Sequence, residues 1–441
     1  MSISKTEYAR RRRNLMGMME PGSIAIVPAA GLQVRSRDTE FPFRQDSDFL
    51  YLSGFNEPDA VLVLMPGRRQ GQFVLFCHER DPVYEQWNGA RIGPEGACAD
   101  YAADDAFPLA DIDDILPGLV EGRNRVYYSM GRSAHFDQRV MNWVQSIRDS
   151  RAPGAVPPGE FTDLDHLLHE LRLFKSAAEL RIMRRAGKIT AAAHARAMRQ
   201  CQPGMLEYQL EAELLHEFAA GGARHPAYAT IVGGGRNACV LHYIDNDSPL
   251  RDGDLVLVDG GCELDHYAAD VTRTYPVNGR FSPAQRAIYE LVLEAHAATL
   301  SEIRPGNTWN KPHDTSVEVL TRGLVRLGLL KGRVSRLIRD GAYRDFYMHK
   351  VGHWLGMDVH DVGEYQVGDK WRVLEPGMVM TVEPGIYIAP DNARVPRKWR
   401  GIGIRIEDNV VVTADGYEML TEAVPRDPDA VEALMQQGPA G

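Results

Sequence analysis

The sequence predicts two domains, an α/β domain over residues 1–172 and an α+β domain over residues 173–441. Three observations support this division. A chain of 441 residues is too long for one ordinary hydrophobic core. A segment rich in proline and glycine, 148–161, is the best linker candidate. A long helical pattern then opens near Arg172 to Ser176, where the second domain is expected to begin.

Short apolar runs predict the strands of the first domain. Each is bounded by glycine, proline or charged residues, and they are "SIAIVPA", "AVLVLMP", "QFVLFCH" and "RVYYSM". The pattern from Ser133 to Ser150 has the period of a helix. Strands and helix together indicate an α/β domain.

Composition restricts the class of protein. Hydrophobic residues make up 44% and charged residues 25%, as in a globular protein, and the net charge of −10 argues against nucleic-acid binding. The five cysteines are scattered without a Cys-x-x-Cys pair, which is typical of reduced thiols in a cytosolic protein. The basic N-terminal run is followed by too few apolar residues for a signal peptide, and a surface helix ending near Glu20 is expected instead. No stretch approaches the roughly 20 apolar residues of a membrane span, so we expect a cytoplasmic protein.

The second domain contains a repeated pattern. Its first helix should begin at Ser176, with Glu179 in capping-box spacing. Further on, "DGDLVLVDGG" (252–261) matches "PGMVMTVEPG" (376–385), with Asp259 and Glu383 in equivalent places. The match is either chance, since a turn, strand, acid and turn is a common pattern, or the mark of two related halves that each deliver one acid to a shared centre.

Carboxylates gather at strand ends of this domain. Asp259 follows one predicted strand and Asp270 lies in the next, so we expect them to face each other. A buried carboxylate needs a cation or donors as its partner. The segment "HKVGHWLGMDVH" supplies histidines, and "GIGIRIEDNVVV" is a predicted strand on which Arg405 and Glu407 share one face. Each residue alone also has an ordinary interpretation: solvated acids, a core His353, and a cross-strand ion pair.

The types of these residues suggest a ligand. Four carboxylates (Asp259, Asp270, Glu383, Glu407) and His353 exceed what a closed tetrahedral zinc site needs. Oxygen-rich ligation with one imidazole fits a pair of harder divalent ions that share bridging carboxylates.

Four segments in order resemble a known family. "VDGGCELDHYAADVTRTY", "HKVGHWLGMDVHD", "LEPGMVMTVEPGIY" and "GIRIEDNVVV" are similar to the metallopeptidases of the pita-bread fold, which include methionine aminopeptidase, prolidase and aminopeptidase P. Residues 36–64 resemble the N-terminal domain of bacterial aminopeptidase P, so the resemblance covers nearly the whole chain. It implies a pita-bread second domain with an internal pseudo-twofold repeat.

The resemblance also implies the roles of individual residues. Two divalent ions, with Mn²⁺ the expected metal, would be bridged by Asp270 and Glu407, completed by Asp259 on one side and by His353 and Glu383 on the other. Glu383 would act as general base, with His349 and His360 as further catalytic residues. The expected substrate-binding residues are His242, Arg405, Tyr387 and Trp87. The glycines before His242, in "VGGGRNACVLHY", lead to another apolar, strand-like run and so do not form a dinucleotide loop.

The implied activity is removal of the N-terminal residue before a proline. A peptide bond to proline has no N–H, so its peptidase needs an apolar slot for the ring, for which Tyr387 and Trp87 are candidate walls. Trp87 lies in the first domain and is expected to reach a neighbouring subunit in a homo-oligomer, a dimer or a tetramer. Prolidase, which cleaves only dipeptides, is the alternative activity. A non-enzymatic peptide- or partner-binding member would typically lose metal ligands, whereas all five positions match here.

Overall fold

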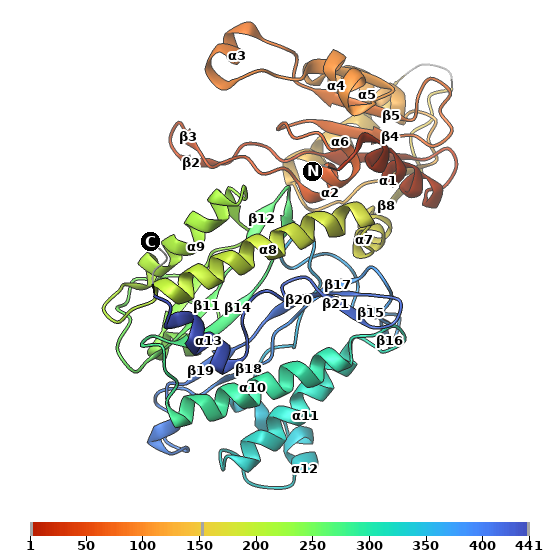
Figure 1. The fold of residues 1–441 in the computed structure, drawn as a ribbon. Coiled ribbons are helices and arrows are strands. Elements are labelled where there is room, and N and C mark those ends of the chain that lie inside the picture. The colour runs from red at the N-terminus through yellow and green to blue at the C-terminus, as the bar shows by residue number, and fades with distance from the viewer. Residues whose placement is uncertain (1–2, 151–153, 439–441) are drawn as a thin grey trace. The chain divides into compact units, whose positions relative to one another are not determined.

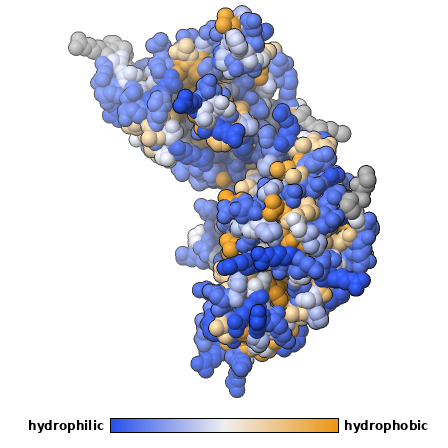
Figure 2. Space-filling model, turned by 90° about the vertical axis from the view of Figure 1, so that its left-hand side faces the viewer, coloured by the Kyte–Doolittle hydropathy of each residue, from blue (hydrophilic) through white to orange (hydrophobic). Residues whose placement is uncertain are grey.

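The computed structural model describes residues 3–150 and 154–438. The chain forms two compact units, Met1–Arg172 and Leu173–Gly441. Figure 2 shows that hydrophilic residues cover most of the face in view, with apolar residues in scattered patches. Among the described helices, none is both long and apolar enough to cross a membrane.

The first unit is built on a six-stranded mixed sheet with the order β6-β5-β4-β1-β7-β8 (Figure 1). Its strands are β1 (Ile24–Pro28), β4 (Val61–Leu64), β5 (Phe73–Cys77), β6 (Asp105–Pro108), β7 (Arg125–Tyr127) and β8 (Glu160–Thr162), with a separate hairpin of β2 (Val34–Ser36) and β3 (Thr39–Glu40). Its helices are α1 (Lys5–Met18), α2 (Ser47–Ser53), α3 (Pro82–Asn88), α4 (Gly93–Tyr101), η1 (Leu109–Asp111), α5 (Ile112–Val120), α6 (Ala134–Asp149) and α7 (Asp165–Leu173). Apolar side chains of α5 and α6 pack with those of the sheet in one core. The α/β prediction is confirmed for this unit.

In this unit, helix α6 forms where it was predicted, whereas the predicted linker is part of the first unit. Helix α6 begins after Ser133, whose hydroxyl accepts from the N–H of Phe136, as the pattern predicted. The proline- and glycine-rich segment 148–161 is not a connection between units, because β8 at its end pairs with β7 in the first sheet; residues 151–153 of the segment lie outside the described residues.

The N-terminal helix also differs in one respect from a solvated surface helix. The guanidinium groups of Arg11 and Arg12 are buried, and they donate to the carbonyls of Tyr51 and Leu52 at 3.1 and 2.9 Å. Part of the basic run is therefore an internal anchor for α2.

The second unit combines helices with several small antiparallel sheets. Its helices are α8 (Ala177–Gln200), α9 (Glu207–Ala220), η2 (Gly235–Cys239), α10 (Pro283–Ser301), α11 (Asn310–Arg326), α12 (Val334–Arg339), η3 (Ala342–Asp345), η4 (Arg397–Trp399) and α13 (Pro428–Met435). Its strands are β9 (His225–Pro226), β10 (Ile231–Gly234), β11 (Leu255–Asp259), β12 (Cys262–Leu264), β13 (Tyr267–Ala268), β14 (Thr272–Pro276), β15 (Gln366–Val367), β16 (Lys370–Trp371), β17 (Val379–Val382), β18 (Gly385–Tyr387), β19 (Gly403–Arg405), β20 (Asp408–Val412) and β21 (Tyr417–Met419). Helix α8 starts with the predicted capping box of Ser176 and Glu179.

The predicted repeat is visible in the architecture of this unit. One half has the helix pair α8 and α9 with the sheet β10-β11-β14, and the other has α10 and α11 with the sheet β17-β20-β21. Figure 1 shows α8 and α10 on opposite sides of these strands. The turn glycines before β11 and β17, Gly253 and Gly377, both have left-handed φ values, +84° and +95°. Asp259 ends β11 and Glu383 directly follows β17, so both halves deliver an acid from the same place.

Candidate active site

A cavity of about 760 Å³ in the second unit collects the predicted site residues. Its lining includes Asp259, Asp270, His353, Glu383 and Glu407, together with His242, His349, His360 and Arg405. Ligating atoms of Asp270, His353 and Glu407 lie within 4.8 Å of one another, a spacing at which one metal ion could be held. Residues separated by about 150 positions in the sequence thus converge on one place.

The two aspartates meet, although not in the way expected. In the β11–β14 pairing Asp259 lies opposite Thr272, and Asp270 precedes the strand. The hairpin of β12 and β13 lies between the two aspartates in the sequence. At its base the backbone of Gly261 packs directly against that of Ala269: a Cβ at Gly261 would lie 1.8 Å from the Ala269 carbonyl oxygen, so only glycine fits there. The hydroxyl of Tyr228 bridges the two carboxylates, 2.6 Å from Asp259 Oδ1 and 2.5 Å from Asp270 Oδ1.

His353 and Glu383 come from two segments that are tied together. The N–H of His353 donates to Thr381 Oγ1 at 3.0 Å, and the N–H of Glu383 donates to the carbonyl of Val351 at 2.8 Å. His353 Nδ1 lies 2.9 Å from the carbonyl of Trp354, which fixes the proton on Nδ1 and leaves Nε2 to face the carboxylates. Nε2 is 3.3 Å from Asp270 and 3.7 Å from Glu383.

Glu407 lies at a bend rather than within one continuous strand. The predicted strand 401–412 is divided into β19 and β20, and Glu407 is buried between them. Thr272 Oγ1 donates to Glu407 Oε2 at 2.6 Å and accepts from Arg405 Nε at 2.9 Å. Arg405 Nη2 is 2.5 Å from Asp259 Oδ2. Arg405 and Glu407 therefore do face the same centre, and Arg405 is the partner of a predicted ligand.

The electrostatics of the cluster favour a bound cation. Burial raises the pKa of Glu383 to about 7, and Asp270 and Asp259 add to the effect. Burial and the neighbouring carboxylates hold the pKa of Glu407 well above its usual range. For Asp270 burial is outweighed by His353 and Tyr228, which lower its pKa. Four carboxylates and one imidazole form the oxygen-rich donor set that divalent metal ions prefer, so these residues fit such ions.

Three further histidines border the same cavity. His349 Nε2 lies 2.9 Å from the hydroxyl of Tyr387, and burial together with Arg405 lowers the pKa of His349 to about 3, so its imidazole is neutral. The ring of His360 stands edge-on to that of His353, with centroids 4.4 Å apart. His242 is exposed and follows η2, a 3₁₀ helix that replaces the strand-like run expected after the glycines of β10.

The cavity has an apolar side, as expected, but its lining residues differ from the two that were predicted. It is lined by Ile231, Leu241, Ile244, Trp309, Val359, Tyr365 and Trp371. Tyr387 was expected as a wall, but it is only 2% exposed, and its hydroxyl bonds to His349 and to Arg405 Nη1. Tyr387 therefore supports polar residues from behind, which corrects that expectation. Tyr228, Trp309 and Trp371 are isolated aromatic residues in irregular or short segments, and no spacing in the sequence marks them.

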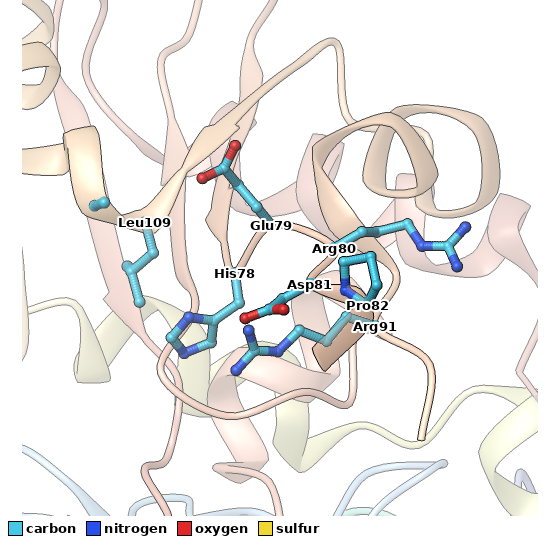
Figure 3. Close-up of a pocket in the computed structure, with 8 residues that line it drawn as sticks. His78, Glu79, Arg80, Asp81, Pro82, Arg91 and Leu109 are labelled. Atoms are coloured by element: carbon cyan, nitrogen blue, oxygen red, sulfur yellow. The ribbon is translucent and has the colours of Figure 1, made fainter. Parts of the chain in front are cut away.

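Trp87 is not among the residues around this cavity. It lies on α3 in the first unit and is 83% exposed. A second cavity of about 390 Å³ lies beside the start of α3 (Figure 3). Figure 3 shows the side chains of His78, Asp81 and Arg91 on one side, with Arg80 pointing away from them. The acids that line this cavity are Glu79 and Asp81, and Arg80 beside them is paired with Glu85. The cavity therefore has fewer acids than the four carboxylates of the first.

The fold and the carboxylate-rich cluster define a metal-dependent hydrolase. Residues 181–414 match the metallopeptidase family M24, and residues 8–127 match the aminopeptidase P N-terminal domain. The chain belongs to metallopeptidase family M24.

Relatives match over nearly the full length. The chain is 49% identical to the Xaa-Pro aminopeptidase of Escherichia coli over 98% of both chains, and 45% identical to that of Haemophilus influenzae over 98% of both. Among solved structures, an aminopeptidase of Pseudomonas aeruginosa is 62% identical with a TM-score of 0.98 and 99% of both chains covered. The predicted pita-bread fold is thereby confirmed.

Proposed function

We propose that this chain is a metal-dependent Xaa-Pro aminopeptidase, which releases the N-terminal residue from peptides with proline in second position. The observation that carries the proposal is the convergence of Asp259, Asp270, His353, Glu383 and Glu407 in one cavity. Relatives that match almost end to end bear the name Xaa-Pro aminopeptidase, which supports the same activity.

The proposed centre holds two divalent ions, with Mn²⁺ as the expected metal. Asp270 and Glu407 would bridge the ions, Asp259 would complete the shell of one, and His353 and Glu383 that of the other. When bound, such ions lower the pKa of a water molecule and polarise the scissile carbonyl. The short distances that already link Asp259, Asp270, His353 and Glu407 support this assignment.

The protein's own groups supply proton transfer and orientation. Glu383 lies in the cavity, 3.7 Å from His349 Nδ1 and from His353 Nε2, where it would accept a proton from the attacking water. His349, His360 and His242 border the cavity, where they would hold the peptide and stabilise charge on its carbonyl oxygen. Arg405 orients Asp259, and Tyr387 links Arg405 to His349.

The specificity for proline follows from the chemistry of its ring. An apolar slot gains from burying the ring, and an alanine there would add an N–H that the slot cannot pair, at a cost of about 1–3 kcal/mol. We expect Ala-Pro-Ala to be cleaved at least about a hundredfold faster than Ala-Ala-Ala, since each 1.4 kcal/mol is about tenfold in rate. Acetylated Ala-Pro-Ala should be inert. Equal rates for the first two peptides would point to a general aminopeptidase.

Prolidase activity is the alternative that the same assay separates. The dipeptide Ala-Pro should be cleaved poorly beside Ala-Pro-Ala, whereas a prolidase would prefer the dipeptide. A non-enzymatic role is disfavoured because none of the five proposed ligands is replaced.

A homo-oligomer and a cytoplasmic location are also proposed. Trp87 and Val83 lie four residues apart on α3, both strongly exposed, which supports α3 as a surface that a neighbouring subunit covers. Sedimentation of the protein with and without Trp87→Ala would test the assembly. The scattered cysteines, all free thiols, agree with a reducing compartment.

A further inference from the structure

The two halves of the second unit meet along the segments 270–274 and 405–409. No strand pairing among the described residues joins β14 to β19 or β20. A backbone hydrogen bond from Glu407 to Thr272 crosses between the segments, and side chains add further bonds. Thr274 Oγ1 accepts from the N–H of Arg405 and donates to its carbonyl, both at 3.1 Å. The two proposed bridging ligands, Asp270 and Glu407, lie on opposite sides of this seam.

Asn409 makes the tightest of the cross-seam contacts. Its Nδ2 donates to the carbonyl of Asp270 at 2.5 Å, and its Oδ1 accepts from the N–H of Asp270 at 3.0 Å. A backbone N–H can only donate and a carbonyl can only accept, so the orientation of the amide is fixed by its partners. One side chain thus holds both backbone groups of a proposed metal ligand, and Asn409 is 2% exposed.

The backbone of Asn409 is itself immobilised. In β20 it pairs with Thr381, its N–H donates to Thr421 Oγ1 at 3.0 Å, and its carbonyl accepts from the N–H of Leu420 at 2.8 Å. The amide therefore reaches Asp270 from a rigid base, two residues after Glu407.

The backbone of Glu407 is held by β14, the strand that follows Asp270. Its N–H donates to the carbonyl of Thr272 at 3.0 Å, and its carbonyl accepts from Arg273 Nη1 at 2.6 Å. Both proposed bridging residues are thus held by their backbones, separately from the hydrogen bonds that Tyr228 and Thr272 make to their carboxylates. A bridging carboxylate must match the spacing of two ions, so small backbone shifts at either residue would change the affinity.

We infer that Asn409 is a positioning residue for the metal centre: its side-chain amide clamps the backbone of Asp270 and so fixes the separation of Asp270 and Glu407. The inference rests on the proposed function, because it takes these two carboxylates as the bridging ligands. A purely structural amide would stabilise the seam without affecting metal binding, and the two roles are separable by experiment.

Gln45 provides a matched control within the chain. Among the described residues, the partners of this fully buried amide are all backbone groups of the first unit. It accepts from the N–H groups of Ala30 and Asp46 and donates to the carbonyls of Phe55 and Glu57. Gln45→Ala should therefore lower stability in the same manner as Asn409→Ala without touching the metal centre.

The test measures Mn²⁺ binding by titration calorimetry on chelator-treated wild type, Asn409→Ala and Gln45→Ala, with the melting temperature of each metal-stripped protein. We expect Asn409→Ala to raise the Mn²⁺ dissociation constant by about 10–100-fold, the usual effect of losing a partner of a metal ligand. Gln45→Ala should lower the melting temperature and leave the dissociation constant within about twofold of wild type. Turnover of Asn409→Ala should recover only at raised Mn²⁺, whereas that of Gln45→Ala should follow the same Mn²⁺ dependence as wild type.

An unchanged dissociation constant in Asn409→Ala, with wild type binding Mn²⁺ normally, would overturn the inference, as would equal losses of affinity in both variants. Failure of wild type to bind Mn²⁺ would instead reject the proposed metal centre. If Asn409→Ala does not fold, Asn409→Ser and Thr421→Val replace it, with the same criteria. Thr421 is chosen because its hydroxyl accepts from the backbone N–H of Asn409 and so helps to position the amide.

Discussion

Arg405 Nη2 lies 2.5 Å from Asp259 Oδ2, so one predicted metal ligand already has a cationic partner inside the protein. Without metal, contact with Asp270 outweighs burial and raises the pKa of His353 to about 9, so a proton on Nε2 takes the place that a metal ion would occupy. A metal ion there would replace that proton, and the cluster would then set the guanidinium of Arg405 against four carboxylates, Asp259, Asp270, Glu383 and Glu407. The remaining negative charge is a physical reason for divalent ions to bind here.

Loss of either bridging carboxylate should empty the whole centre. We expect Asp270→Ala and Glu407→Ala each to lose both ions and all measurable turnover, because a bridging ligand belongs to the shells of both metals. Metal analysis after desalting gives the ion content directly. Retention of one full equivalent by either variant would show that the residue serves a single ion.

Removal of metal should lower stability as well as activity. Ligand that binds only the folded state stabilises by mass action, about 2.7 kcal/mol at a hundredfold excess over the dissociation constant. A chelator should therefore lower the melting temperature, and Mn²⁺ should restore it in a concentration-dependent way. Asp270→Ala is the control, because its melting temperature should not respond to Mn²⁺. A response of the same size in that variant would place the stabilising metal elsewhere.

His349 should affect turnover without being needed to hold metal. Its imidazole borders the cavity next to Glu383, with Nδ1 3.7 Å from Oε2. We expect His349→Ala to lose about a hundredfold or more in kcat, the scale of one lost catalytic donor, with its metal content unchanged. His360→Ala should behave in the same direction. A metal-free His349→Ala protein would mean that the ligand assignment around His353 is wrong.

An acid-sensitive network is expected in the first unit around Asp48. Burial opposes the charge of Asp48, but Arg172 and His169 outweigh it and hold its pKa well below the usual range. A lowered carboxylate pKa contributes stability that is present above the unfolded value, about 3.9, and is lost as pH falls toward the folded value. Asp48→Asn removes the carboxylate that lies 2.7 Å from Arg172 Nη1 and should cost about 3–5 kcal/mol at pH 7, the usual effect of removing one member of a buried ion pair. Urea unfolding between pH 2.5 and 7 should show a smaller loss of stability below pH 4 in the variant than in wild type.

The sequence predicted the site better than it predicted the surroundings of the site. The acids at strand ends were identifiable because a carboxylate beside an apolar strand is costly unless it has a partner, and the repeat placed Asp259 and Glu383 in equivalent positions. The geometry that joins them was not identifiable. The hairpin between Asp259 and Asp270 requires the backbone of Gly261 to pack directly against that of Ala269, and the hydrophobic periodicity of the sequence does not reveal this contact.

Side-chain direction was the other limit. Tyr387 was expected in the apolar wall because of its closeness in sequence to Glu383, yet it is buried behind His349. Tyr228 reaches both aspartates from an irregular segment that carries no pattern at all. Such contacts arise from tertiary packing between distant segments, so they cannot be predicted from the local sequence pattern.

The buried hydroxyl of Tyr387 supports a last prediction. It accepts from Arg405 Nη1 at 3.0 Å and lies 2.9 Å from His349 Nε2, so it links the partner of Asp259 to a proposed catalytic histidine. Tyr387→Phe keeps the packed ring and removes both hydrogen bonds. Because each lost bond to a charged or buried group costs about 1–3 kcal/mol, kcat/KM for Ala-Pro-Ala should fall about 10–100-fold while metal content stays unchanged. Tyr289→Phe is the matched control. That tyrosine is also buried and, within the part of the chain that the structure describes, its hydroxyl bonds only to the carbonyl of Arg426 at 2.8 Å, so the variant should lose stability but keep wild-type kcat/KM. If the two variants lose activity equally, the hydroxyl of Tyr387 is a structural support and not a link in the active site.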